Sequence, residues 1–174
     1  MRGLALDQSL KSTGYALWDE GEPLVSGAWP LSDGIATRAN AFLAIHRKIA
    51  AFHKEKPIDW LVYETPELMR KDKVDKLIGL YGLVAHIESI CKIKLIAVSP
   101  VRSRKWRTCF FDHDYNGAGT EKFKAMAIHR AKEFGFDPEV DDEAEAIGIM
   151  DWALHDRGFT PQWRIDNPFP ASPC

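Results

Sequence analysis

Two short apolar runs in this chain each end on a carboxylate, and a helical pattern lies between them. Residues 4–6 are followed by Asp7, and residues 60–63 are followed by Glu64. From Phe42 to Phe52, apolar residues recur at the spacing of an amphipathic helix. A strand, a crossover helix and a parallel strand share one sheet, so the carboxyl ends of both strands meet at one edge. The two carboxylates are therefore predicted to lie together.

The rest of the chain continues this alternation of strands and helices. Strands are predicted at residues 3–7, 13–18, 24–29, 60–63 and 94–98. Helices are predicted from the N-cap pair Ser32-Asp33 to residue 56, and over residues 72–91, 120–134 and 142–155. Three strands followed by alternating helices and strands indicate an α/β protein, in which helices pack on the faces of a mixed sheet.

Length and composition are those of one globular domain. A chain of 174 residues with 45% hydrophobic residues can bury a sizeable core. Residues 1–157 are predicted to form this domain, and residues 158–174, which contain four prolines, an irregular C-terminal tail. No apolar run reaches the roughly 18 residues that a membrane span needs, so we expect a cytoplasmic protein without membrane contact.

A second group of acids occupies the start of the last predicted helix. Asp142 and Glu145 are three residues apart and share one helical face. Acids in a first helical turn are favourable with the helix dipole, which accounts for residues 141–143 but poorly for Glu145, whose neighbours are small or apolar. A shift of one residue rotates a helical side chain by about 100°, so Asp141 remains an alternative to Asp142.

These four carboxylates, without clustered His or Cys, are typical of a site for a hard cation. Taken singly, Asp7 is also typical of a turn and Glu64 of a solvated strand end. Taken together, Asp7, Glu64, Asp142 and Glu145 are the predicted metal ligands and catalytic residues. Oxygen ligands suit Mg²⁺, for which Mn²⁺ can substitute. Two such ions roughly 3.5–4 Å apart can activate water and stabilise the leaving oxygen in phosphodiester hydrolysis.

Basic residues are crowded in the sequence near these acids, although the net charge is only −2. The predicted DNA-binding residues are Lys11, Arg70, Lys71, Lys73, Arg102, Arg104 and Arg107. They are suited to contacting backbone phosphates, and one cation beside the acids could offset charge that develops in the transition state. For each basic run taken singly, a solvated helix face is the alternative interpretation.

Together these motifs resemble the RuvC-like Holliday junction resolvases of the ribonuclease H-like superfamily. The resemblance rests on residues 7–15, on Val62-Tyr63-Glu64 and on residues 142–146, and it extends over residues 3–155 with similar order and spacing. It implies a ribonuclease H-like fold with a mixed five-stranded sheet flanked by helices on both faces. It also implies a homodimer through the helix at residues 72–91, where Gly79 and Gly82 could permit close approach. The implied activity is Mg²⁺-dependent paired nicking of four-way DNA junctions, with two ions per site.

The resemblance also assigns individual residues. The four acids take the acidic positions of the family, with Glu145 where Asp is more usual. The basic residue of the family near the active site falls on Arg104 or Lys105, and Lys105 is the predicted catalytic amine. Gln8-Ser9 replaces the usual Pro-Gly, and no aromatic follows Glu64 where bacterial members have one. In these departures the chain resembles members that phages and prophages encode.

Three functions are compatible with this sequence. The leading hypothesis is a metal-dependent, structure-selective endonuclease that resolves four-way and other branched DNA junctions. A ribonuclease H-type hydrolase of RNA/DNA hybrids is the first alternative, which the glycine-containing helix and the Asp142-x-x-Glu145 ending disfavour. The second alternative is a junction-binding protein without catalysis, and the presence of all four acids disfavours it.

Overall fold

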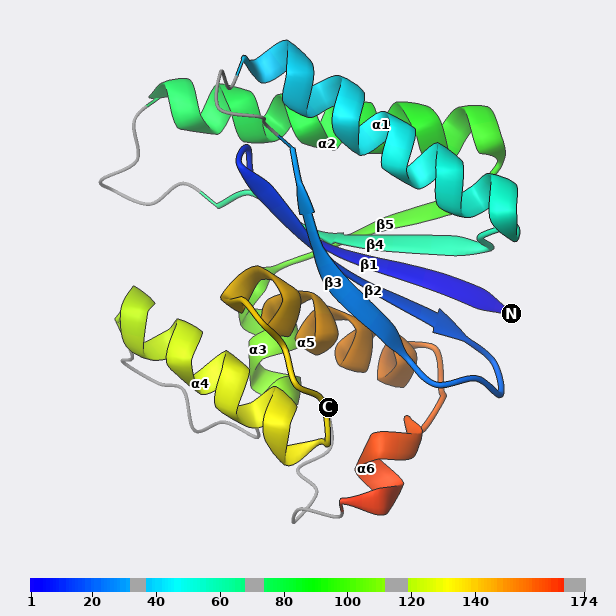
Figure 1. Cartoon of the computed structure of the whole chain (residues 1–174), viewed down its shortest axis with the longest axis vertical. Coiled ribbons are helices and arrows are strands. Elements are labelled where there is room, and N and C mark those ends of the chain that lie inside the picture. The colour runs from blue at the N-terminus through cyan, green and yellow to red at the C-terminus, as the bar shows by residue number, and fades with distance from the viewer. Residues whose placement is uncertain (32–36, 68–73, 112–118, 168–174) are drawn as a thin grey trace.

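The computed structural model describes residues 1–31, 37–67, 74–111 and 119–167. In these ranges the chain forms five strands and six helices (Figure 1). They are β1 (Arg2–Gln8), β2 (Ser12–Asp19), β3 (Val25–Pro30), α1 (Arg38–Glu55), β4 (Trp60–Glu64), α2 (Val74–Lys94), β5 (Ala97–Val101), α3 (Ser103–Phe110), α4 (Thr120–Glu133), α5 (Asp141–Asp156) and α6 (Gln162–Asp166).

The strands form one open, mixed sheet in the order β3-β2-β1-β4-β5. The strand β2 pairs antiparallel with both β1 and β3, whereas β4 pairs parallel with both β1 and β5. The predicted mixed five-stranded sheet is therefore confirmed, and so is the parallel pairing of the two acid-ended strands.

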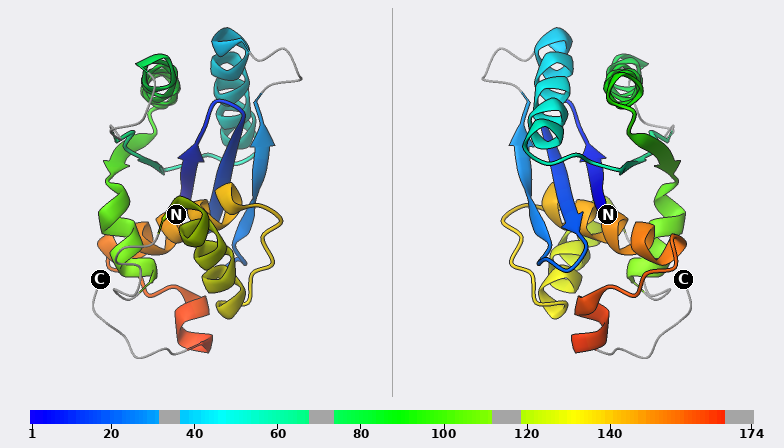
Figure 2. Two further views of the ribbon diagram at one scale, coloured as in Figure 1. Left: turned by 90° about the vertical axis from the view of Figure 1, so that its left-hand side faces the viewer. Right: turned by 90° about the vertical axis from the view of Figure 1, so that its right-hand side faces the viewer.

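Helices cover both faces of the sheet, which also confirms the prediction. The pair α1 and α2 lies on one face, and α3, α4, α5 and α6 lie on the other (Figure 2). Successive side chains of a strand point to opposite faces, so β1 contributes to both cores. Leu4 and Leu6 pack in the core under α1 and α2, while Ala5 packs in the core that contains Ala144 and Ile147 of α5.

The helix α5 lies unusually close to the sheet because a glycine faces its first turn. A Cβ atom on Gly14 of β2 would lie 1.7 Å from the carbonyl oxygen of Asp142. Small residues continue this close contact, since Ala144 and Ala146 are fully buried. The first turn of α5, with its acids, is therefore held against the end of the sheet.

The glycines of α2 also have partners within the chain. A Cβ atom on Gly79 would lie 2.5 Å from Cδ1 of Leu10, and one on Gly82 would lie 2.3 Å from the ring of Phe42 in α1. Both glycines thus allow the packing of α2 against its own chain. The close approach of a second chain, for which the sequence analysis invoked them, is not needed to explain them.

The largest differences from the predicted boundaries concern the last strand and the start of the first helix. The last strand was expected at residues 94–98, but α2 continues to Lys94 and β5 occupies Ala97–Val101, including Pro100. Proline is tolerated there because β5 is an edge strand, where a missing N–H need not break a ladder. The helix α1 begins at Arg38, where Thr37 accepts a hydrogen bond from the Asn40 backbone N–H. The predicted N-cap pair Ser32-Asp33 lies outside the described residues.

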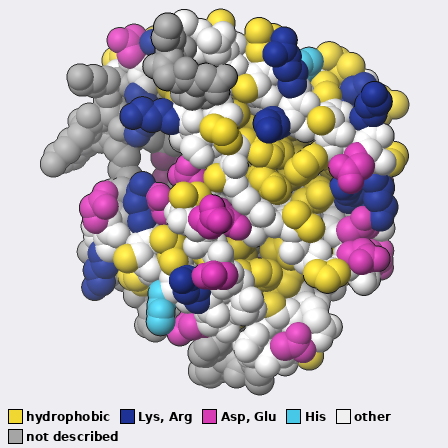
Figure 3. All heavy atoms as spheres, viewed as in Figure 1, with side chains coloured by type: hydrophobic (Ala, Val, Ile, Leu, Met, Phe, Trp, Pro, Cys, Tyr) yellow, Lys and Arg dark blue, Asp and Glu magenta, His cyan; other side chains and the backbone are white. Residues whose placement is uncertain are grey.

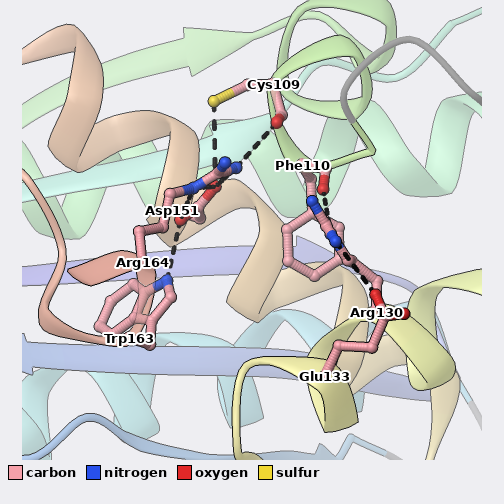
Figure 4. Close-up of polar contacts among 7 residues, drawn as sticks. All are labelled: Cys109, Phe110, Arg130, Glu133, Asp151, Trp163 and Arg164. Carbon is pink, nitrogen blue, oxygen red and sulfur yellow. Dashed lines mark hydrogen bonds and ion pairs between the residues drawn. The ribbon is translucent and has the colours of Figure 1, made fainter. Parts of the chain in front are cut away.

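The tail is not irregular throughout, which corrects the prediction for residues 158–174. Its helix α6 is joined to α5 by a buried ion pair (Figure 4). Arg164 donates to the fully buried carboxylate of Asp151 from Nε at 3.0 Å and from Nη2 at 2.6 Å, and Trp163 donates to it at 2.8 Å. Pro161 is compatible with α6 because it precedes the first turn, where its missing N–H breaks no helical hydrogen bond. Residues 168–174 lie outside the described residues.

Arg130 makes one contact between helices and one within its own helix. Arg130 of α4 donates to the backbone carbonyl of Phe110 in α3 at 2.9 Å and to Glu133 at 3.0 Å (Figure 4).

Among the described helices, none combines the length and the apolar character that crossing a membrane requires.

Candidate metal centre

The register of the sheet brings Asp7 and Glu64 together. Leu6 of β1 pairs with Tyr63 of β4, so the two acids that follow continue in step at the carboxyl ends of parallel strands. Leu6 and Tyr63 belong to the core under α1 and α2, so the alternating acids point toward the opposite face, where α5 lies. The sequence prediction that these two carboxylates meet is borne out by this geometry.

The helix α5 adds a third carboxylate to this pair. Oxygen atoms of Asp7, Glu64 and Glu145, one from each side chain, all lie within 4.8 Å of one another. Glu145 is only 7% exposed, in agreement with its apolar neighbours in the sequence. Three oxygen donors at this spacing, without His or Cys in the group, fit a divalent hard cation.

The two aspartates at the start of α5 have different partners. Asp141 forms an ion pair with Lys124 of α4, with 2.5 Å between Oδ2 and Nζ. The Ser12 side chain in β2 lowers the pKa of Asp142 without cancelling the rise that burial causes, and Asp142 lies near enough to Asp7 to raise the pKa of Asp7. Asp142 is outside the group of three, but of the two aspartates it is the one whose charge acts on Asp7.

Three acids of the site, Asp7, Asp142 and Glu145, have raised pKa values. Burial is the main cause of the strongly raised pKa of Asp7, and the charges of Glu145, Glu64 and Asp142 add to it. Burial also raises the pKa of Glu145 to about 7, with a further contribution from Glu64. Arg107 opposes both shifts without cancelling them. The group therefore carries more negative charge than its surroundings neutralise, which favours a cation from outside.

The helix α3 holds Glu64 in place. Trp106 donates from Nε1 to Oε2 of Glu64 at 2.7 Å, and the Ser103 hydroxyl donates to Oε1. A carboxylate oxygen has more than one acceptor site, so these bonds orient Glu64 and leave it able to bind a cation.

Arg107, and not Lys105, is the cation that the structure places at the acids. Its Nη2 atom lies 3.6 Å from Oε2 of Glu145 and 4.0 Å from Oε1 of Glu64. Its guanidinium lies 3.8 Å from the ring centroid of Phe123. Lys105 is exposed, with Nζ 5.9 Å from the ring centroid of Trp152, so the structure does not bring the predicted catalytic amine to the group.

Sequence reasoning missed this role of α3 although a signal was present. Ser103, Trp106 and Arg107 have the i, i+3, i+4 spacing of one helical face. Lys105 is two residues from Arg107, which puts it roughly 200° around the helix. A helical interpretation of the basic run therefore puts the two cations on different faces.

The remaining predicted DNA-binding residues are only partly described. Lys11 is exposed in the turn between β1 and β2, and Arg102 and Arg104 are exposed at the start of α3. Arg70, Lys71 and Lys73 lie outside the described residues. On the face of the molecule in Figure 3, basic and acidic side chains are interspersed.

A cleft of about 180 Å³ opens beside the acids. Asp7 and Glu64 line it from the strand ends, Ser103 and Arg107 from α3, and Leu80 from α2. The candidate metal centre is thus accessible from the space between α2 and α3.

This arrangement agrees with solved structures of known proteins. RuvC of T. thermophilus in complex with a Holliday junction substrate matches with a TM-score of 0.69 at 10% identity, over 91% of this chain and 96% of that chain. This chain has the RuvC fold. A second Thermus thermophilus RuvC structure matches with a TM-score of 0.67 at 13% identity over the same shares. The yeast mitochondrial Holliday junction resolvase Ydc2 matches with a TM-score of 0.56 at 10% identity, over 94% of this chain and 80% of that chain.

Comparisons of the whole sequence with protein families and with curated proteins find no match. At 10–13% identity, the likeness to RuvC lies in the arrangement of the elements.

Proposed function

We propose that this protein is a divalent-metal-dependent endonuclease that resolves four-way and other branched DNA junctions. The observation that carries this proposal is the group of three carboxylates formed by Asp7 and Glu64, at the ends of two parallel strands, and Glu145 of α5. The fold supports the choice of substrate, because RuvC with this fold is known in complex with a Holliday junction.

The proposed cofactor is Mg²⁺, with Mn²⁺ as a substitute. Asp7, Glu64 and Glu145 would hold the ions, with Asp142 as the fourth ligand, and the set of oxygen donors fits either cation. When bound, two such ions supply an activated water and stabilise the leaving oxygen of a phosphodiester.

The other residues of the site orient the Glu64 carboxylate or offset negative charge. Trp106 and Ser103 hold the Glu64 carboxylate in one orientation. The charge of Arg107 stands beside the acids, where negative charge develops during phosphodiester cleavage. Lys11, Arg102 and Arg104 can extend the contact along backbone phosphates, which carry most of the affinity in DNA binding.

We infer that two copies act together, because paired nicking needs two active sites. The exposed side chains of Val74, Ile78 and Tyr81 on α2 support this inference. Their i, i+4, i+7 spacing puts them on one helical face. A two-fold symmetric contact through this face would use the same patch on both copies.

The decisive experiment is cleavage of a synthetic four-way junction in which each strand is labelled in turn. The wild-type protein should cut two opposite strands in Mg²⁺ or Mn²⁺ and should be inactive in EDTA. Asp7→Asn removes a metal ligand and should lower the rate more than about a hundredfold while retaining the wild-type circular dichroism spectrum. An Asp7→Asn protein that cuts as fast as wild type would contradict the proposal.

Linear duplex DNA and an RNA/DNA hybrid belong in the same assay. Cleavage of the hybrid alone would identify a ribonuclease H-type enzyme. Tight junction binding that persists without any cleavage or metal binding would identify the non-catalytic alternative.

A further inference from the structure

Gln8 follows Asp7 directly at the end of β1, and the two side chains point to opposite faces of the sheet. Because strand side chains alternate, Gln8 points toward the α2 side while Asp7 points toward α5. Its side chain is only 8% exposed. Its amide nitrogen Nε2 donates a hydrogen bond to the backbone carbonyl of Glu64, just beyond the last ladder pair of β1 and β4.

This hydrogen bond fixes the orientation of the Gln8 amide. A carbonyl oxygen can only accept, so the NH₂ group must face Glu64 and Oε1 must face away from it. Within the described residues, Oε1 of Gln8 is buried and has no hydrogen-bond partner. A buried acceptor without a partner is unfavourable, and in native structures such groups are few.

The unpartnered oxygen belongs to a residue that lines the cleft beside the metal centre. Gln8 is on its wall together with Asp7, Glu64 and Ser103, and Leu80 of α2 lies on it as well. A substrate strand whose phosphate reaches the acids must pass this wall. On the proposed function, the nucleotide beside the reacting phosphate would therefore lie next to Gln8.

The chemistry of DNA limits what can satisfy this acceptor. Phosphate oxygens are acceptors, and an internal deoxyribose carries no hydroxyl group. The hydrogen-bond donors of DNA are the amino and ring N–H groups of its bases. A carboxamide can normally donate and accept hydrogen bonds, but Nε2 of Gln8 already donates to the Glu64 carbonyl. The acceptor Oε1 is the part of the amide that remains for a base.

We propose that Gln8 is a specificity-determining residue, whose Oε1 accepts a hydrogen bond from a base N–H next to the scissile phosphate. This inference rests on the proposed function and deepens it. It assigns a sequence preference at one flanking position to Gln8-Ser9, where bacterial members of the resembled family have Pro-Gly. A base with a donor at that position is cut faster than one without.

The test uses junctions that differ only at the base pairs flanking the cut, together with Gln8→Met, which keeps the side-chain length and removes the amide. Wild type should prefer the best flanking base over the worst by roughly tenfold, as expected for one base contact. Gln8→Met should cut all junctions at rates within about twofold of one another. Lys11→Met is the matched control on the adjoining turn, because loss of a phosphate contact lowers cleavage of all sequences alike.

A second measurement leaves the protein unchanged and removes the donor from the DNA. Replacing the preferred guanine by inosine, or adenine by purine, deletes one amino group. This deletion should lower wild-type cleavage as much as the worst natural base does, whether or not Gln8→Met folds.

Several outcomes would overturn the inference. The first is a Gln8→Met variant that keeps the wild-type preference for the flanking base. The second is a lower affinity of Gln8→Met for Mn²⁺, measured by calorimetry. The third is faster cleavage by the wild type when a single ribose replaces the flanking deoxyribose. The second would make Gln8 a support of the metal centre, and the third a reader of the 2′-hydroxyl. A wild type that neither cuts nor binds junctions would overturn the proposed function and this inference with it, whereas cutting without the Gln8-dependent preference would overturn this inference alone.

Discussion

Asp151 and Glu145 are buried carboxylates of the same helix, α5, and their surroundings differ in kind. Asp151 is fully buried, but it receives hydrogen bonds from Arg164 and Trp163. Glu145, six residues earlier and 7% exposed, has Arg107 at 3.6 Å, and that guanidinium is shared with Glu64. A buried charge is tolerated when it is paired. Asp151 is thus neutralised within the chain, whereas Glu145 and Glu64 share one guanidinium, which leaves the group able to take up a cation under the proposed function.

The largest expected effect concerns the complete pair. Asp151→Ala should lower the free energy of unfolding by roughly 3–5 kcal/mol, because it leaves Arg164 without its buried partner and frees α6 from α5. Urea denaturation followed by circular dichroism measures this change. The matched control is Glu133→Ala, which removes a partly exposed partner of Arg130 and should change stability by less than about 1 kcal/mol. If Asp151→Ala lowered the free energy of unfolding as little as Glu133→Ala, Asp151 would not differ from Glu145 in the way described above.

At the incomplete end, removing the charge should stabilise the metal-free protein. Glu145→Gln deletes a carboxylate whose pKa burial and Glu64 raise to about 7, so at pH 8 the variant should gain roughly 1–3 kcal/mol. The same variant should lose most of the rise in melting temperature that Mg²⁺ or Mn²⁺ gives the wild type. A variant that melts lower than wild type without metal would show that Glu145 stabilises the fold, as Asp151 is expected to do.

The pH dependence of stability sharpens the same contrast. Glu145 has a usual pKa of 4.5 and a pKa of about 7 in the folded protein, and the pKa of Asp7 is raised as well. Their protonated forms favour folding, so this contribution is complete below about pH 4.5 and is lost as the pH rises through 7. The metal-free protein should therefore melt at a lower temperature at pH 8 than at pH 6. Added Mg²⁺ should raise the melting temperature more at pH 8 than at pH 6.

The smallest expected effect distinguishes Arg107 from Lys105 in α3. Arg107 lowers the pKa of both Asp7 and Glu145, so Arg107→Ala should raise both pKa values further. The pH at which Mn²⁺ binding is half-maximal in calorimetry should then move upward. Lys105→Ala is the control and should leave that midpoint unchanged, because Lys105 lies over Trp152. A larger shift for Lys105→Ala would restore it as the cation of the site.

Much of the site could be predicted from the sequence because its main signals are local. An apolar run that ends on Asp7 or Glu64 predicts a strand with a carboxylate at its end, and an intervening helix predicts parallel pairing. The i, i+3 spacing of Asp142 and Glu145 likewise follows from one helix. The cation could not be chosen in this way, because Lys105 and Arg107 are both basic residues of one short run.

The sequence by itself determined the order of the elements, the sheet with its two acid-ended strands, and the carboxylates that gather there. These features depend on periodicity and chain connectivity, which are properties of neighbouring residues. Only the tertiary structure decided which face of α3 meets the acids, how closely α5 approaches Gly14, and that Arg164 in the tail neutralises Asp151. These outcomes depend on the rotation and distance of elements far apart in the chain, which are settled by packing.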